Sequence, residues 1–283
     1  MAERVKGEKL RERCAHIYEA AQRWWAENGV PSVLGRERFI DTSRGPVRVL
    51  EYGFERAGAP LLFNLHGGGW MLLHADADEY LVTEILKKAP VRVVSIDYLK
   101  GPDNPFPAAL ESSYEVIRAY ARGKPVGVMG QSAGGNMAAS LCLLAARRGD
   151  VRFSYQVLDY PVLDLLTDAY LKPEPDPEGM PASLADAYSA CYAGDADRGD
   201  PLLSPLFAAP EELKKTPPAF VLACGIDALR REALSYAEKL KESGVPATLC
   251  EFTAMRHAFT NAAIPETAEA ADKIAAFINE RLA

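Results

Sequence analysis

The sequence predicts an α/β fold with a mostly parallel central sheet and helices on both of its faces. Short runs of apolar and β-branched residues recur along the chain, and stretches with helical periodicity fall between them. Several of the short runs are almost continuously apolar, as is typical of strands that are covered on both sides. With 283 residues, 48% of them hydrophobic and 25% charged, the chain can bury a large core, which excludes a disordered or fibrous protein.

Each element is predicted from its local pattern. Charged residues and regularly spaced apolar ones predict an amphipathic helix over residues 8 to 27, which Asn28-Gly29-Val30-Pro31 ends. The predicted strands are Val47 to Tyr52, Leu61 to Leu65, Val91 to Ile96, Val126 to Met129, Phe153 to Leu158, Ala219 to Ala223 and Ala247 to Phe252. The predicted helices between and after them are about 77 to 88, 107 to 121, 133 to 148, 230 to 243 and 267 to 281.

One long segment interrupts this alternation. Between Val162 and Pro218 the sequence is rich in proline and shows no strand pattern, and it is too long for an ordinary loop. We expect it to be a small helical cap over the carboxyl edge of the sheet. The sequence thus predicts a single domain over residues 1–283, with a cap contributed by about 1–35 and about 162–215.

Charge and apolar content limit the class of partner. The net charge is −7, and no stripe of Lys and Arg offers the footprint that nucleic acid requires. The first residues are dominated by charge, which predicts no signal peptide and a cytoplasmic protein. The longest apolar run, Met137 to Ala146, is too short to span a bilayer, so no membrane span is predicted.

The cysteines favour no covalent framework. They are odd in number, widely scattered and never in a Cys-x-x-Cys pair, which argues against disulfides and against a zinc site. We expect all five to be small buried hydrophobic residues. They are Cys14, Cys142, Cys191, Cys224 and Cys250.

A candidate nucleophile lies in Gly130-Gln131-Ser132-Ala133-Gly134-Gly135, directly after one predicted strand and before one predicted helix. A nucleophilic serine must stand on a tight strand-to-helix turn, where flanking glycines avoid clashes and the helix amino end favours negative charge. The alternative is a glycine-rich turn in which Ser132 only caps the helix.

A second motif, His66-Gly67-Gly68-Gly69-Trp70, follows the strand Leu61 to Leu65. Its glycines allow backbone N–H groups to approach a ligand closely, as stabilisation of a tetrahedral oxyanion requires. A phosphate-binding loop is less favoured because no Gly-Lys-Ser/Thr follows. A tight turn with a buried histidine is the remaining alternative.

Together these motifs show a resemblance. From about Leu50 to the C-terminus, the chain resembles the hormone-sensitive-lipase-like esterases, a family of α/β-hydrolases that carries His-Gly-Gly-Gly, Gly-Asp-Ser-Ala-Gly-Gly-Asn, Asp-x-Leu-Arg-Asp-Glu and His-Gly-Phe. The counterparts here are His66 to Gly69, Gly130 to Asn136, Asp227 to Glu232, and His257 to Phe259. The resemblance implies the α/β-hydrolase fold and a catalytic triad of Ser132, Asp227 and His257.

The order of these residues agrees with that assignment, because hydrolases of this kind run serine, acid, histidine. Asp227 and His257 each follow a predicted strand, at the sheet edge where parallel strands end. Asp159 and Asp164 are alternative acids, but they precede the predicted cap, so Asp227 is preferred. The resemblance also implies an oxyanion hole, which is formed by the N–H groups of Gly68, Gly69 and Ala133. We expect Trp70 and Met71 to line the substrate site.

The chain departs from the family in four places. Gln131 stands where the family has an acidic residue, and Ala258 where it has glycine; neither change removes a reacting group. The family often shows Tyr-Arg-Leu-Ala-Pro-Glu, whereas this chain has Tyr98-Leu99-Lys100-Gly101-Pro102-Asp103, without the arginine and the glutamate. Their loss is expected to change how this loop is braced and hence the shape of the pocket.

Other polar and aromatic residues have ordinary interpretations. His16 is expected to lie on the surface or in packing, and His74 with Asp76 and Asp78 to make turn bonds rather than a metal site. Trp24, Trp25 and Tyr18 are predicted either to cover the entrance or simply to pack.

The sequence therefore predicts a serine carboxylesterase that acts on short-chain acyl esters, with no metal and no organic cofactor. An amide or peptide hydrolase with the same triad is one alternative. A non-catalytic small-molecule receptor on the same fold is the other, although such receptors lose the histidine that is present here as His257. The expected partner is a small ester; the oligomeric state stays open, with a homodimer compatible with the sequence.

Overall fold

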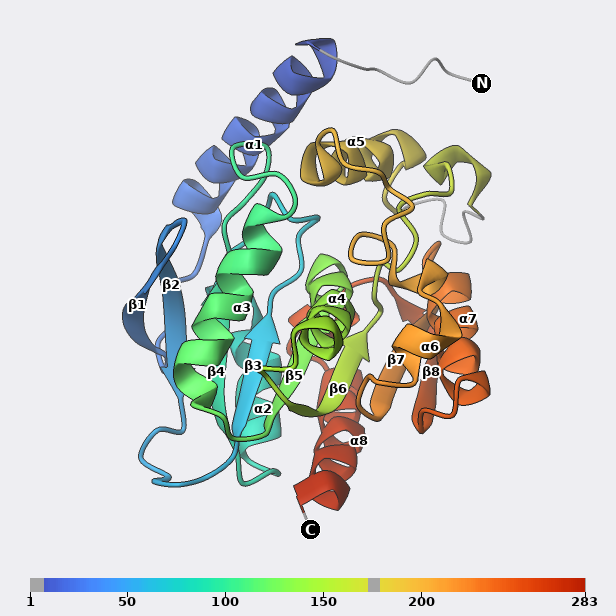
Figure 1. Cartoon of the computed structure of the whole chain (residues 1–283). Helices are drawn as coiled ribbons and strands as arrows, with labels where there is room; N and C mark the ends of the chain where they lie inside the picture. The colour runs from blue at the N-terminus through green and yellow to red at the C-terminus, as the bar shows by residue number, and fades with distance from the viewer. Residues whose placement is uncertain (1–7, 173–178, 283) are drawn as a thin grey trace.

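An eight-stranded sheet forms the centre of the protein in the computed structural model, which describes residues 8–172 and 179–282 (Figure 1). The strand order is β1-β2-β4-β3-β5-β6-β7-β8. Strands β3 to β8 run parallel, whereas β2 pairs antiparallel with both β1 and β4. The strands are β1 Arg36–Thr42, β2 Gly45–Tyr52, β3 Leu61–Leu65, β4 Arg92–Asp97, β5 Val126–Gln131, β6 Phe153–Asp159, β7 Ala219–Ile226 and β8 Ala247–Arg256.

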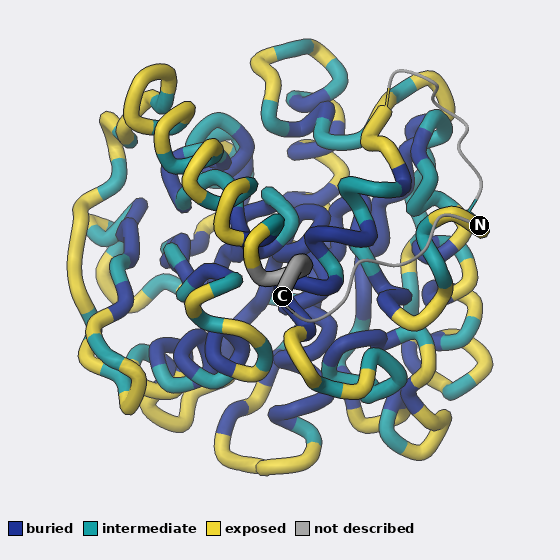
Figure 2. The backbone as a smooth tube through the Cα atoms, turned by 90° about the horizontal axis from the view of Figure 1, so that it is seen from above, coloured by how far each residue is buried: buried dark blue, intermediate teal, exposed yellow. Residues whose placement is uncertain are grey.

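Helices cover both faces of this sheet, as the sequence predicts. Helices α3, α4 and α7 pack with one buried apolar cluster on one face, and α2 and α8 pack with a second cluster on the other. Seen from above, buried backbone occupies the middle of the molecule and exposed backbone its rim (Figure 2). The α-helices are α1 Glu8–Asn28, α2 Glu79–Leu86, α3 Ala108–Ala121, α4 Ala133–Arg148, α5 Ala182–Ala193, α6 Pro210–Leu213, α7 Arg230–Glu242 and α8 Pro265–Leu282.

All seven predicted strands are present, and β1 is an additional strand that was not predicted from the sequence. This strand lies at the edge of the sheet, and most of its side chains are exposed. Its sequence, Arg-Glu-Arg-Phe-Ile-Asp-Thr, therefore carries charges instead of an apolar run. Charged side chains are a common protection of an edge strand against further pairing, and they conceal the strand from a search for apolar runs.

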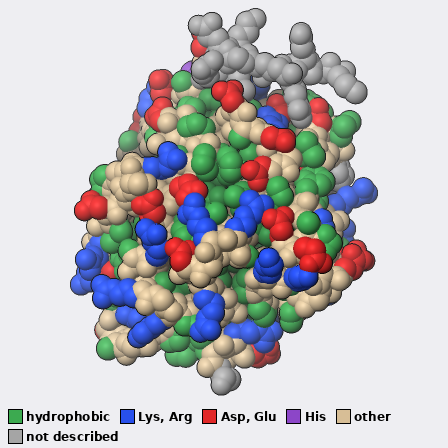
Figure 3. All heavy atoms as spheres, in the orientation of Figure 1, with side chains coloured by type: hydrophobic (Ala, Val, Ile, Leu, Met, Phe, Trp, Pro, Cys, Tyr) green, Lys and Arg blue, Asp and Glu red, His purple; other side chains and the backbone are tan. Residues whose placement is uncertain are grey.

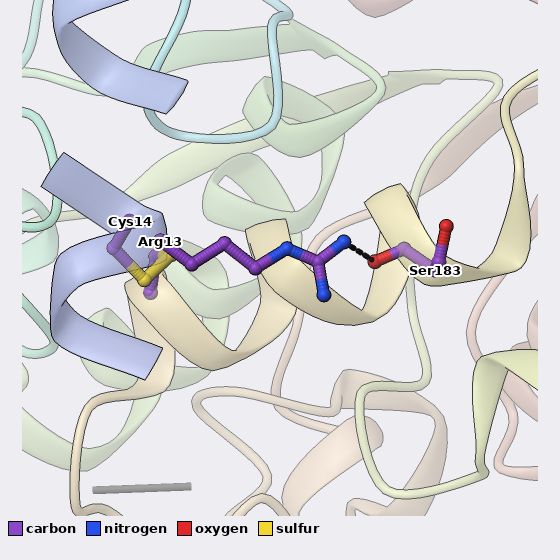
Figure 4. The surroundings of a disulfide bond; sticks show 4 residues. Arg13, Cys14 and Ser183 are labelled. Carbon is purple, nitrogen blue, oxygen red and sulfur yellow. Dashed lines mark hydrogen bonds between the residues drawn. A yellow bond between two sulfur atoms is a disulfide. The ribbon is translucent and has the colours of Figure 1, made fainter. Parts of the chain in front are cut away.

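Helices α1 and α5 lie beyond the carboxyl ends of the strands and contact each other (Figure 1). The expectation that all five cysteines are unpaired is wrong here, because Cys14 of α1 forms a disulfide with Cys191 of α5 (Figure 4). The bridge spans 177 positions, so only the folded chain brings the two cysteines together. Beside it, Arg13 donates a hydrogen bond of 3.0 Å to the carbonyl of Ser183.

The second half of the predicted cap segment takes a different position. The short helix η3 (Pro205–Phe207) and α6 contact α4 and α7. The amide of Leu206 donates to the carbonyl of Leu163, and Lys239 of α7 donates to the carbonyl of Leu206. The segment from η3 to α6 therefore packs against the helices on one face of the sheet. Of the predicted cap segment, α5 is the helix that lies above the carboxyl edge of the sheet.

The surface mixes charges of both signs. On the face shown in Figure 3, acidic and basic side chains both occur. Arg148, for example, pairs with Glu111 at 2.8 Å, and Arg147 with Glu212 at 2.8 Å. Among the described helices, none is long and apolar enough to cross a bilayer.

Candidate active site

Ser132 lies on a tight turn between β5 and α4, with a backbone φ of +52°. Such a φ is unfavourable for a residue with a side chain, and it is typical of a turn that lifts a serine above the sheet. The flanking glycines make the turn sterically feasible. A Cβ atom on Gly130 would lie 2.1 Å from the carbonyl oxygen of Gly134, and one on Gly134 would lie 1.9 Å from that of Leu65.

Ser132, His257 and Asp227 form a continuous chain of hydrogen bonds. The Nε2 atom of His257 lies 2.9 Å from Oγ of Ser132, and its Nδ1 atom lies 2.8 Å from Oδ2 of Asp227. The amide of Leu229 donates to the other carboxylate oxygen of Asp227 at 3.0 Å. Because β5, β7 and β8 run parallel, the loops that follow them all lie at one edge of the sheet and bring these side chains together.

Burial differs along this chain of residues. The side chain of Asp227 is 5% exposed, whereas that of His257 is 26% exposed and the ring of Tyr160 packs edge-on against it at 4.8 Å. Of the alternative acids, Asp159 is fully buried and accepts a hydrogen bond from Thr260, while Asp164 accepts one from the amide of Thr167. The carboxylate that meets His257 is therefore that of Asp227.

The glycine loop His66 to Gly69 lies directly beside Ser132. A Cβ atom on Gly67 would lie 3.6 Å from Cβ of Ser132. Gly68 and Gly69 have positive φ values of 102° and 59°, and within the described residues their amides donate to no acceptor. Two free N–H groups beside a serine hydroxyl can bind an oxygen that becomes negatively charged.

A pocket opens next to these residues, with about 980 Å³ of empty space, part of it open to solvent. Ser132, His257 and Trp70 line it. The indole of Trp70 is almost buried and stacks on the ring of Tyr192 at 4.4 Å. Met71 does not line the pocket, contrary to expectation. The amides of Met71 and Leu72 both donate to the carbonyl of Gly68, and this turn directs Met71 into the cluster around the disulfide.

Most of the pocket wall comes from residues that were not predicted from the sequence to lie at the site. They belong to the predicted cap: Val162, Leu165, Thr167, Ala169, Lys172, Gly179, Met180, Ala182, Ala185, Asp186, Tyr188, Ser189 and Arg198. No motif marks them, because a wall requires only shape and polarity. The proline-rich break in the strand pattern was the one signal for this region.

Three charged side chains of the pocket wall have partners nearby. Lys172 contacts the buried carboxylate of Glu232 at 2.6 Å, and Arg198 contacts Asp186 at 3.2 Å. Burial raises the pKa of Glu232, and the charge of Lys172 opposes that effect. Glu232 also accepts the amides of Leu163 and Asp164, so it holds the start of the cap segment in place.

The departures from the family sequence have structural consequences below the site. The amide of Gln131, fully buried, donates to Asn64, which in turn donates to Asp78 at 3.0 Å. Burial raises the pKa of Asp78 to about 7. Ala258 has a φ of +65°, in the region where its family counterpart, glycine, is favoured.

The other residues singled out from the sequence lie away from the pocket. His74, Asp76 and Asp78 bond to different partners, which are Asp97, Arg48 and Asn64 respectively. Among the described residues, no group of three or more His, Cys, Asp or Glu side chains could hold a metal ion. Trp24 is 55% exposed, Trp25 contacts the ring of His74, and Tyr18 packs against the cluster around the disulfide.

Fold and sequence together define the class of protein. A family model described as alpha/beta hydrolase fold matches residues 62–261, and the chain belongs to this family. Two similar proteins come from Mycobacterium tuberculosis. Carboxylesterase NlhH is 33% identical over 239 residues, which are 80% of this chain and 75% of that protein. Esterase LipI is 30% identical over 251 residues, which are 83% of this chain and 78% of that protein.

Solved structures lead to the same group. The hyperthermophilic esterase of the archaeon Pyrobaculum calidifontis is 28% identical and has a TM-score of 0.80, with 96% of this chain and 94% of that chain covered. A thermostable esterase from Pseudomonas putida is 26% identical and has a TM-score of 0.82, with coverages of 95% and 91%. This protein is a carboxylic ester hydrolase of the hormone-sensitive-lipase-like family.

Proposed function

We propose that the enzyme hydrolyses short-chain acyl esters through an acyl-enzyme intermediate, with Ser132 as nucleophile, His257 as general base and Asp227 as the residue that orients it. The observation that carries this proposal is the continuous hydrogen-bond chain from Oγ of Ser132 through both ring nitrogens of His257 to Asp227. A weak nucleophile that is bonded to a base, which is in turn oriented by a third group, is the arrangement that nucleophilic catalysis requires.

In the first half of the reaction, Oγ of Ser132 attacks the ester carbonyl carbon while Nε2 of His257 accepts the hydroxyl proton. The carbonyl oxygen becomes an oxyanion, and the amides of Gly68, Gly69 and Ala133 would stabilise it. His257 then gives its proton to the leaving alcohol as the C–O bond breaks. In the second half, water attacks the acyl-enzyme with the same base, which releases the carboxylic acid and restores Ser132.

The preference for short acyl chains is supported by the wall of the pocket. Lys172, Asp186 and Arg198 line it beside apolar side chains, so an alkyl chain that extends past the apolar part would cover charged groups that are still partly exposed to water. Short or oxygen-bearing acyl groups avoid that cost. The substrate that we propose is therefore a small, water-soluble ester.

Hydrolysis of p-nitrophenyl esters from acetate to palmitate tests this proposal, with Ser132→Ala beside the unaltered enzyme. Turnover should be highest for short acyl chains and should fall on the order of 10⁶-fold in Ser132→Ala. Ser140→Ala is a matched control, because Ser140 is a buried serine on α4 and does not line the pocket. A loss of less than tenfold in Ser132→Ala would contradict the assignment of the nucleophile.

A parallel panel of p-nitroanilides tests the two alternatives raised by the sequence, which are an amide hydrolase and a non-catalytic receptor. Anilide hydrolysis that exceeds ester hydrolysis would indicate an amide hydrolase with the same residues. An enzyme that turns over neither class, and whose Ser132 does not react with an organophosphate, would indicate a receptor.

A further inference from the structure

The loop Tyr98 to Asp103 lacks the arginine and the glutamate that the family often shows at these positions. Leu99 stands in the place of the arginine and packs against the core, and Asp103, in the place of the glutamate, is exposed. The loop nevertheless makes close contacts with the glycine loop beside Ser132. Other residues must therefore hold it.

Asp97, at the end of β4, is the centre of a buried cluster of charged and polar groups. Its carboxylate contacts Lys100 at 2.5 Å, His74 at 2.9 Å and Arg48 at 3.2 Å. His66, the first residue of the glycine loop, lies 3.5 Å away. The side chains of Asp97 and Lys100 are only 7% and 8% exposed, so solvent screens their attraction weakly.

The protonation state of the Asp97 carboxyl group follows from these contacts. Burial by itself would raise the pKa of Asp97, but the neighbouring ring of His66, the hydrogen bond with His74 and the charge of Lys100 lower that pKa well below its usual range. The carboxylate is therefore ionised, and Lys100 is the cation that it holds on the same loop. The ammonium group also lies 5.8 Å from the centre of the Tyr98 ring.

Two contacts transmit this bracing to the glycine loop. The hydroxyl of Tyr98 donates to the carbonyl of His66 at 2.9 Å, and the Tyr98 ring stacks on the His66 ring at 4.1 Å. On the other side, the amide of Gly101 donates to the carbonyl of Trp70 at 3.1 Å. The two hydrogen bonds hold both ends of the run from Gly67 to Gly69.

We infer that Lys100 is a positioning residue: bound to Asp97, it braces the Tyr98 loop and thereby fixes the amides of Gly68 and Gly69 beside Ser132. Leu99 and Asp103 cannot supply this bracing, whereas Lys100 reaches the buried carboxylate from within the same loop. Lys100 touches no reacting atom, and its effect on the reaction passes through Tyr98 and Gly101.

The kinetic test compares Lys100→Met, which keeps the side-chain length and removes the charge, with Lys100→Arg, which keeps the charge. This kinetic comparison rests on the proposed function, because it requires an ester that the enzyme hydrolyses. Because donors that are displaced from the oxyanion lose transition-state stabilisation and leave substrate binding intact, kcat of Lys100→Met should fall about tenfold or more while KM stays within about twofold. Lys100→Arg should recover most of kcat. Rates are divided by the concentration of active sites, which is measured by reaction with an organophosphate. A variant that is partly unfolded therefore does not appear to have a lower kcat for that reason.

A second measurement does not depend on activity. Hydrogen–deuterium exchange of residues 66–72 should be faster in Lys100→Met than in the unaltered enzyme, and Lys100→Arg should restore it. Lys87→Met is the matched control, because Lys87 is an exposed lysine that pairs with Glu84 three residues away. Unchanged exchange in Lys100→Met would overturn the inference, even if the enzyme hydrolyses no ester. Faster exchange together with unchanged kcat would overturn the link from bracing to catalysis and leave the proposed function intact.

Discussion

Removal of the Cys14–Cys191 disulfide should lower the thermal unfolding midpoint of the protein. The bridge spans 177 positions, and the chain-entropy model gives about 5 kcal/mol for a closed loop of that length, while disulfides typically contribute about 2 to 4 kcal/mol. A chain of 283 residues has an unfolding entropy of about 0.6 kcal/mol/K near its midpoint. The double variant Cys14→Ser/Cys191→Ser should therefore unfold about 3 to 9 °C lower.

Differential scanning fluorimetry at several scan rates measures this difference. Cys250→Ser is the control, because Cys250 is a partly exposed cysteine with a free thiol and should leave the midpoint nearly unchanged. A double variant that unfolds within 1 °C of that control would contradict the predicted stabilisation by the disulfide. Thiol titration of the unreduced, unfolded chain gives an independent reading: three reactive thiols are expected, and five would show that the bridge does not form.

The same titration on protein trapped by alkylation inside cells addresses location. Disulfides are rare in reducing compartments, so the state of the Cys14–Cys191 bridge inside cells reports on the compartment that holds the protein. Three free thiols in trapped material would place the protein in an oxidising environment, and five would favour the cytoplasm.

Three further substitutions follow from the geometry. Gly69→Ala should lower kcat at least tenfold, because the new Cβ would lie 2.7 Å from the ring of Tyr188; initial rates with p-nitrophenyl acetate measure it. Asp78→Asn should gain stability relative to the unaltered enzyme as pH rises. Because burial raises the folded-state pKa to about 7, the stability that Asp78 gives at low pH is lost as pH rises through that value. Urea unfolding should show the gain to be about 3 kcal/mol larger at pH 8 than at pH 5. Ala258→Gly should raise the midpoint by about 1 to 3 °C, because it relieves the φ of +65°; an unchanged or lower midpoint would contradict this.

Local sequence patterns were sufficient to predict the elements whose structure depends mainly on neighbouring residues, namely the buried strands and the turn at Ser132. Each of the seven apolar runs became a strand, since a strand that is covered on both faces must be apolar along its length. The turn that carries Ser132 was predictable because it demands glycine at fixed positions, as the close approaches at Gly130 and Gly134 show.

What escaped prediction depends on contacts between distant segments. Nothing near Cys14 indicates a partner 177 positions away, and odd, scattered cysteines are usually unpaired. Met71 follows a glycine loop that was expected to border the substrate site. The turn at Gly68 instead directs the Met71 side chain into the cluster around the disulfide. The charged strand β1 was missed because its pattern reflects an edge that faces solvent.

The candidate catalytic side chains and most of the pocket wall come from different segments of the chain, and this separation determines how such an enzyme can acquire new substrates. The loops after β5, β7 and β8 supply the three side chains that we propose take part in the reaction, whereas most of the pocket wall comes from residues 162–172 and 179–198. Mutations in that segment can therefore alter which esters enter without disturbing the alignment of Ser132 and His257. A combinatorial library restricted to the wall positions Leu165, Thr167, Ala169, Ala182 and Ala185 should retain far more active clones than one of equal size spread over the glycine loop and the strand ends.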